Sequence, residues 1–289
     1  MVKKVLSLLI GVVVFSVLFA SSGLAAGEKV VSLGSNLSKA QRSEMLEYFD
    51  VDEEDVKIIT VTNKEEREYL AGIAPESKIG TRAISSAFVE LMDEGEGITV
   101  ETYNIDWVTE EMYASALTTA GVKDARVIAA APFKVSGTAA LTGITKAFEE
   151  ISGKKLSKDA KEIANEELVK TGELGDEIGK DKAAALVKEI KEKVIKDGVK
   201  DPDRIYQIII QIAGDLNINL SEKQIQELVS LMEKIAKLDI SVADIQTQLK
   251  NIQGYLDKIA RSQEEAKGIL EQIRNFFQKI VEWIQRILR

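Results

Sequence analysis

The fold of this chain is decided by the stretch Lys29-Val-Val-Ser-Leu-Gly-Ser-Asn-Leu-Ser-Lys-Ala-Gln-Arg-Ser-Glu-Met-Leu-Glu-Tyr-Phe49. Its opening run, up to Leu33, predicts a strand, and Met45, Leu46 and Phe49 recur at the spacing of one helix face. A capping-box pattern, Ser-x-x-Gln from Ser38, lies between the two. A strand that passes through a capped turn into an amphipathic helix indicates an α/β unit.

The same alternation continues along the first half of the chain. The short loop Asp93–Gly97 contains two glycines and lies between two strand-like runs, so it predicts a β-hairpin. Helices are expected to begin near Asn63, Thr109 and Thr138. Further strands are expected at 56–61, 83–92, 98–103 and 125–131, the last ended by Pro132. The sequence therefore predicts an α/β sandwich with a mixed sheet.

Residues 152–289 predict an all-α helical region. Helix starts are expected at Ser157, Asp181, Asp201, Ser221 and Ser241. Apolar residues keep a 3-4 spacing from residue 228 onwards, which also fits one long coiled coil, but the cap signal at Ser241 favours separate helices. The expected organisation is a signal peptide at 1–26, an acidic α/β domain at 27–151 and a helical bundle at 152–289.

The first 26 residues have the layout of a secretory signal peptide. Lys3 and Lys4 precede an uncharged apolar run, and small residues follow up to Ala26. We expect cleavage after Ala25 or Ala26; the alternative is a retained N-terminal anchor, because the uncharged stretch is long enough to span a bilayer. Either outcome predicts an extracytoplasmic protein, secreted or peripherally associated with the cell envelope.

Composition excludes several chemistries. The chain contains no histidine and no cysteine, so Ser-His-Asp and Cys-His triads, disulfides and ordinary zinc sites are ruled out. Carboxylate chemistry, hard-cation binding through oxygen ligands and Ser/Lys or Thr/Lys pairs remain open, although we expect neither a metal nor a cofactor. Residues 27–150 carry 23 acidic and 12 basic side chains, a net charge of −11, which argues against a nucleic-acid partner.

Polar residues gather where predicted strands meet predicted helices. In open α/β sheets ligands bind at the carboxyl ends of strands, beside helix N-termini. The alternative is that these side chains are caps and turn formers. The candidate ligand-binding residues of this kind are Ser35, Asn36, Asn63, Ser136 and Thr138.

Arg82 is a separate candidate, because it begins an apolar run in the base-poor half of the chain. A guanidinium there could clamp a carboxylate or a phosphate. The alternative is an internal ion pair with one of the many acids.

The segment Gln263–Arg289 combines a broad apolar face with aromatic and cationic side chains, and residues 272–289 carry four bases and one acid. That composition is typical of a helix lying on a membrane surface. The competing interpretation is packing within the helical bundle or self-association. The candidate contact residues are Phe276, Phe277, Trp283 and Arg286.

Four runs of sequence closely resemble the YpuA-like family, an exported bacterial domain of unknown function numbered 1002. They are Val31–Leu37, Val61–Glu66, Ile79–Ser86 and Ala131–Gly143. The resemblance implies an exported protein of Gram-positive, Bacillus-like bacteria, and it supplies no catalytic residues.

These observations favour an exported envelope protein that binds or interacts without catalysis, with an unidentified small ligand. The alternative is an extracytoplasmic hydrolase that uses carboxylates. That alternative requires a deep pocket holding two acids about 5–10 Å apart.

Overall fold

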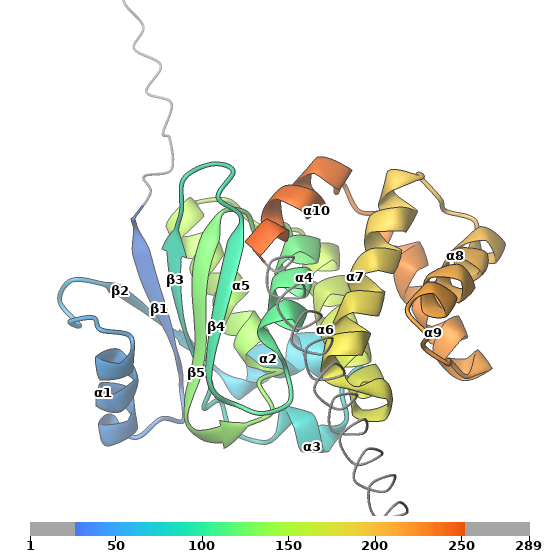
Figure 1. The fold of residues 1–289 in the computed structure, drawn as a ribbon. Coiled ribbons are helices and arrows are strands. Elements are labelled where there is room, and N and C mark those ends of the chain that lie inside the picture. The colour runs from blue at the N-terminus through green and yellow to red at the C-terminus, as the bar shows by residue number, and fades with distance from the viewer. Residues whose placement is uncertain (1–26, 252–289) are drawn as a thin grey trace, which may run out of the picture.

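The computed structural model describes residues 27–251. A five-stranded sheet is flanked by helices, and an all-α region follows it along the chain, which confirms the predicted fold class (Figure 1). The strands are β1 (Lys29–Gly34), β2 (Lys57–Val61), β3 (Ser86–Leu91), β4 (Ile98–Ile105) and β5 (Ala125–Val135). The helices between and directly after them are α1 (Lys39–Tyr48), α2 (Asn63–Leu70), α3 (Glu76–Ile79), α4 (Glu110–Ala120) and α5 (Ala140–Ser152).

The strand order is β2-β1-β3-β5-β4, and the sheet is mixed. β1 pairs in parallel with β2, and β4 pairs in parallel with β5. β3 is antiparallel to both of its neighbours, β1 and β5. The expected mixed sheet is therefore present.

The predicted hairpin around Asp93–Gly97 is wrong, because β5 lies between β3 and β4. Two strand spacings amount to about 10 Å, which a five-residue loop can cross. The loop is anchored by Asp124 at the entrance to β5: its carbonyl accepts from Met92 N and its carboxylate from Gly97 N. β5 is apolar on both faces, so an interior position between β3 and β4 buries more of it than an edge would.

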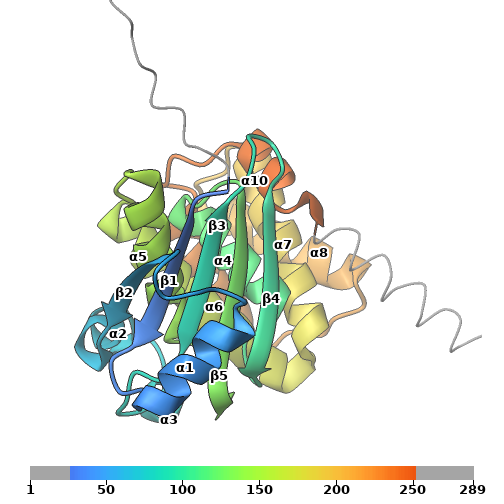
Figure 2. The same ribbon diagram turned by 90° about the vertical axis from the view of Figure 1, so that its left-hand side faces the viewer.

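The two faces of the sheet are covered differently. α4 and α5 pack on one face and bury Val89, Val127 and Ala129. On the other face, α1 is the one helix of the described residues that crosses the strands (Figure 2), and Met45 together with Phe49, which follows α1, covers one end of that face. The capping box predicted at Ser38 is present and sets the start of α1.

The helical region comprises α6 (Lys158–Ile178), α7 (Lys180–Lys196), α8 (Pro202–Asp215), α9 (Glu222–Ile235) and α10 (Val242–Gln248). α6 packs on α4, and its Ala164 and Leu168 belong to the same buried cluster as the sheet. The predicted separate helices are confirmed within the described part of the chain, because α9 ends and α10 starts with its own capping box at Ser241.

α10 returns to the sheet and contacts the loop before β4. Asn251 Nδ2 donates to the carbonyl of Glu96, and Gln248 exchanges hydrogen bonds with Asp124. None of the helices within residues 27–251 is long and apolar enough to cross a bilayer. The predictions for residues 1–26 and for Phe276, Phe277, Trp283 and Arg286 lie outside the described residues.

Candidate functional site

A hollow of about 550 Å³ opens at one end of the sheet, between the segment 77–85 and the end of β5. This volume is in the range of small-molecule sites, roughly 300–1,000 Å³. Its charged lining residues are Lys78, Arg82, Lys134 and Asp106, a formal charge of three minus one, or +2. A cationic hollow stands out in a region whose net charge is −11.

Asn36 holds the backbone beside Arg82. Its side-chain Oδ1 accepts from Ala83 N at 2.9 Å, and its own N donates to the Ala83 carbonyl at 3.0 Å. Glycine is needed at position 34, because a Cβ there would lie 2.4 Å from the Ala83 carbonyl oxygen. The turn after β1 and the segment before β3 are thereby joined.

Arg82 is exposed, and its Nη2 donates to the Asn36 carbonyl at 3.3 Å. Within residues 27–251 no carboxylate lies within ion-pair distance of the guanidinium. The described part of the chain therefore does not provide the internal ion pair that was the alternative for this residue. The guanidinium keeps donor groups available for a ligand.

The side chains of Ser136 and Thr138, which follow β5, hydrogen-bond to the backbone of the segment 77–85 on the opposite side of the hollow. Both hydroxyls donate to the Lys78 carbonyl, at 2.6 Å and 2.8 Å. They fix α3 against the end of β5, as the turn-forming interpretation expects. Ser136 also lines the hollow, whereas Thr138 is fully buried.

Asn63 and Ser35 lie outside the lining of the hollow. Asn63 Nδ2 donates to Glu66, and its Oδ1 accepts from Arg67 Nε at 3.1 Å. Arg67 in turn donates to the Gly80 carbonyl at 2.8 Å, so Asn63 supports the segment 77–85 from behind. Ser35 is exposed and bonds through its backbone N to the Val61 carbonyl.

Phe133 and Lys134 were not among the predicted site residues, because the expected strand ended at Pro132. β5 instead continues to Val135, and the register shifts between the pairs Tyr103/Ala130 and Ile105/Val135. Asn104 alone faces the four residues 131–134, which form a large bulge. The signal was Pro132 itself, since proline inside a strand is confined to edges and bulges.

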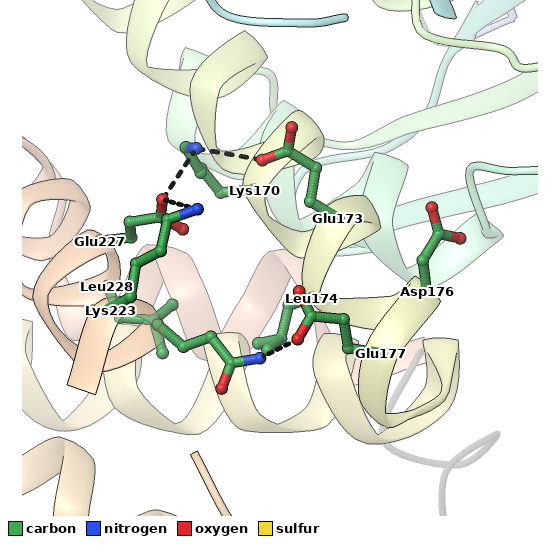
Figure 3. A pocket seen from close by; sticks show the side chains of 9 residues that line it. Lys170, Glu173, Leu174, Asp176, Glu177, Lys223, Glu227 and Leu228 are labelled. Atoms are coloured by element: carbon green, nitrogen blue, oxygen red, sulfur yellow. Dashed lines mark hydrogen bonds and ion pairs between the residues drawn. The ribbon is translucent and has the colours of Figure 1, made fainter. Parts of the chain in front are cut away.

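A second, carboxylate-rich hollow of about 380 Å³ lies between α6 and α9 (Figure 3). There Lys170 Nζ lies 3.0 Å from Glu173 and 3.7 Å from Glu227, and Gln224 donates to Glu177 at 2.6 Å. A hydrolase of the carboxylate type needs one acid kept protonated. The carboxylates of this hollow are instead engaged by Lys170 and Gln224, so this arrangement suits a polar seam between helices.

One hydroxyl–lysine pair of the kind that composition left open is also present. Lys191 Nζ lies 2.7 Å from Ser115 Oγ, but it also lies 2.8 Å from the Glu167 carboxylate. The side chains of Lys191 and Glu167 are 0% and 1% exposed. A substrate could reach this pair only if α4, α6 and α7 separated, so the arrangement is a buried structural network.

Comparison with known proteins identifies relatives without an assigned activity. A family model described as "Protein of unknown function (DUF1002)" matches residues 33–252. The Bacillus subtilis (strain 168) "Uncharacterized protein YpuA" is 43% identical over 266 residues, which cover 92% of this chain and 91% of that protein. No solved structure matches.

Proposed function

Because the chain belongs to the DUF1002 family of proteins of unknown function, we propose a function from its own geometry. The protein is an exported envelope protein that binds a small anion in the hollow between segment 77–85 and the β5 bulge, without transforming it. The observation that carries this proposal is the exposed Arg82 guanidinium, which lines the hollow and has no acidic partner among residues 27–251.

The chemistry of the hollow supports an anion. A guanidinium presents a planar set of donors that matches a carboxylate or phosphate, often with two parallel hydrogen bonds. Lys134 adds a second cation that makes no ion pair within the described residues. Lys78 is less available, because its Nζ lies 4.4 Å from the Trp107 ring centre and 4.0 Å from Asp176.

Arg82→Met is expected to weaken anion binding by at least about tenfold, because one charge-assisted contact is worth more than about 1.4 kcal/mol. The free energy of unfolding should change by less than about 0.5 kcal/mol, since the side chain is exposed. Isothermal calorimetry with inorganic phosphate and with citrate measures the affinities, and urea denaturation measures the stability.

The matched control is Lys200→Met, which removes an exposed cation in the loop between α7 and α8. It should leave both affinities unchanged. Equal losses in the two variants would reduce the effect to overall charge, and a large loss of stability in Arg82→Met would mark Arg82 as structural.

Export is the second part of the proposal. The layout of residues 1–26 supports it, and the cationic, aromatic-rich segment 263–289 supports contact with a membrane surface. In fractionated producing cells the protein is expected outside the cytoplasm. Its mass should be that of a chain that begins at Ala26 or Gly27. Deleting 263–289 should move envelope-bound protein into the medium. Intact Met1 in a cytosolic fraction would contradict export, and full-length protein in the medium would contradict membrane contact.

A further inference from the structure

The β5 bulge carries an exposed aromatic ring into the hollow. Phe133 is 45% exposed and lines the hollow beside Lys134. The bulge depends on Asn104, whose φ of +57° lies in the left-handed region and whose Nδ2 donates to the Ala131 carbonyl at 2.9 Å. Bulges re-aim side chains next to binding sites, and a strained φ is retained where the surrounding structure enforces it.

The hollow also contains unused hydroxyls. Ser77, Thr81 and Ser85 line it, and their hydroxyls make no hydrogen bond to another side chain or backbone group of residues 27–251. A hydroxyl both donates and accepts, so it suits a ligand that is itself rich in hydroxyl groups. The cations, the hydroxyls and the aromatic ring thus offer three kinds of contact within one hollow.

We propose that the ligand is an acidic saccharide, a sugar ring that bears a carboxylate or a phosphate. Its acid group binds Arg82 and Lys134, and an apolar face of the ring lies on Phe133. Its hydroxyls bond to the free hydroxyls of the 77–85 wall. This inference rests on the proposed anion binding and adds the class of ligand.

A simple anion would leave most of this hollow unused. At about 550 Å³ it exceeds what one inorganic ion fills, and Phe133 gives such an ion no contact of benefit. An aromatic acid would use the ring but leave the three hydroxyls without polar partners, which costs binding energy once water is displaced. The saccharide acid satisfies both parts of the lining.

The test measures the binding of glucuronate, glucose 6-phosphate, glucose, benzoate and inorganic phosphate to protein purified from the producing cells. Calorimetry up to about 10 mM covers the weak affinities expected of single sugars. At least one of the two saccharide acids is expected to bind about tenfold or more tightly than inorganic phosphate, glucose and benzoate. Which of the two binds more tightly identifies the acid group.

Variants separate the contacts. Phe133→Leu should weaken binding of the saccharide acid by at least about tenfold and that of phosphate far less, whereas Arg82→Met should weaken both. Tyr48→Leu is the matched control, because Tyr48 is 39% exposed and lies on α1, outside the lining of the hollow. It should change neither affinity, and thermal unfolding followed by circular dichroism checks that each variant is folded.

The outcomes distinguish the two levels of inference. If phosphate or benzoate binds as tightly as the saccharide acids, or if Phe133→Leu has no effect, the saccharide is overturned while anion binding stands. If none of the anions binds to folded protein, both are overturned. Tight binding of glucose alone would contradict the role given to Arg82.

Discussion

Lys191→Met is expected to lower the free energy of unfolding by about 3–5 kcal/mol, because it leaves the Glu167 carboxylate buried without its cation. Both side chains are buried, and their N–O distance is 2.8 Å. Lys191 Nζ also donates to the Ser115 carbonyl and to the hydroxyls of Ser115 and Thr119, so every ammonium proton has an acceptor.

The fully satisfied network joins three helices. Lys191 comes from α7, Glu167 from α6, and Ser115 and Thr119 from α4, which packs on the sheet. Burial lowers the pKa of Lys191, and the Glu167 carboxylate opposes that shift. Removing one partner of such a buried ionic network strongly destabilises the fold. Replacing both partners by apolar side chains of similar volume is often neutral.

The double variant Lys191→Met/Glu167→Met is therefore expected to recover most of the loss. The two single changes should be non-additive by at least about 2 kcal/mol. Lys158→Met is the control, because Lys158 and Glu162 form an exposed pair whose removal should cost less than about 0.5 kcal/mol. Urea denaturation measures all four variants. If Lys191→Met is as stable as the double variant, Lys191 is not needed to compensate the Glu167 charge.

Four of the five helices described in the helical region could be predicted from local signals, because each of these four carries its own side-chain cap. The exception is α7, which was expected to begin at Asp181 but begins at Lys180 after Gly179, without a side-chain cap. Ser157, Asp201, Ser221 and Ser241 each accept a hydrogen bond from the third residue of the helix that follows. Such contacts depend on a few neighbouring residues, so the sequence alone contains them. The network of Lys191 and Glu167 could not be predicted this way, since its members lie 24 to 76 residues apart.

The order of the strands was harder to predict from the sequence, because it also depends on contacts between residues far apart along the chain. The loop Asp93–Gly97 has the composition of a turn whether or not a strand lies between its ends, and Asp124, which anchors it, lies 27 residues from Gly97. β5 rather than β4 lies beside β3 because this position buries both faces of β5. That burial depends on the whole sheet and not on the loop. A pattern of local turn residues indicates where the chain bends but not which strands pair.

The candidate site could be predicted in part from the sequence. Asn36 and Ser136 were predicted from their places after strands, and Arg82 from its place at the start of an apolar run in the base-poor half. All three hold or line the segment 77–85. Phe133 and Lys134 were missed because Pro132 was interpreted as the end of the strand. A proline within an otherwise apolar strand pattern carried the information, since it signals either an end or a bulge.

Glu66→Gln is expected to raise the free energy of unfolding by about 3 kcal/mol at pH 8 and to leave it nearly unchanged at pH 4. Glu66 is 1% exposed, and its pKa is raised from 4.5 to about 7, chiefly by burial. Within that net shift, the hydrogen bond from Asn63 and the charge of Arg67 lower the pKa, and the neighbouring Glu65 carboxylate raises it.

The sign follows from proton binding in the two states. Below pH 4.5 the carboxyl is protonated whether the chain is folded or unfolded, so it makes no difference to stability. Between pH 4.5 and about 7 the unfolded chain ionises while the folded protein keeps the proton, so stability falls by about 1.4 kcal/mol per pH unit. Above about pH 7 both states are ionised and the loss is complete. Glutamine never ionises, so the variant lacks this loss.

Other carboxyl groups of the protein also change stability with pH. Their contributions cancel when the stability of the variant is compared with that of wild type at each pH. Glu65 and Asp244, for example, have lowered pKa values, so the stability that they contribute is lost only as the pH falls through their own folded values. Urea denaturation of wild type and Glu66→Gln at intervals from pH 4 to pH 8 isolates Glu66. Glu68→Gln, an exposed change on the same helix, should follow the wild-type curve. If the Glu66→Gln curve also runs parallel to wild type, the pKa of Glu66 is the same in the folded as in the unfolded chain, and the carboxylate is ionised in the folded protein over most of this range. Asn63 and Arg67 would then stabilise its charge beside the segment that carries Arg82.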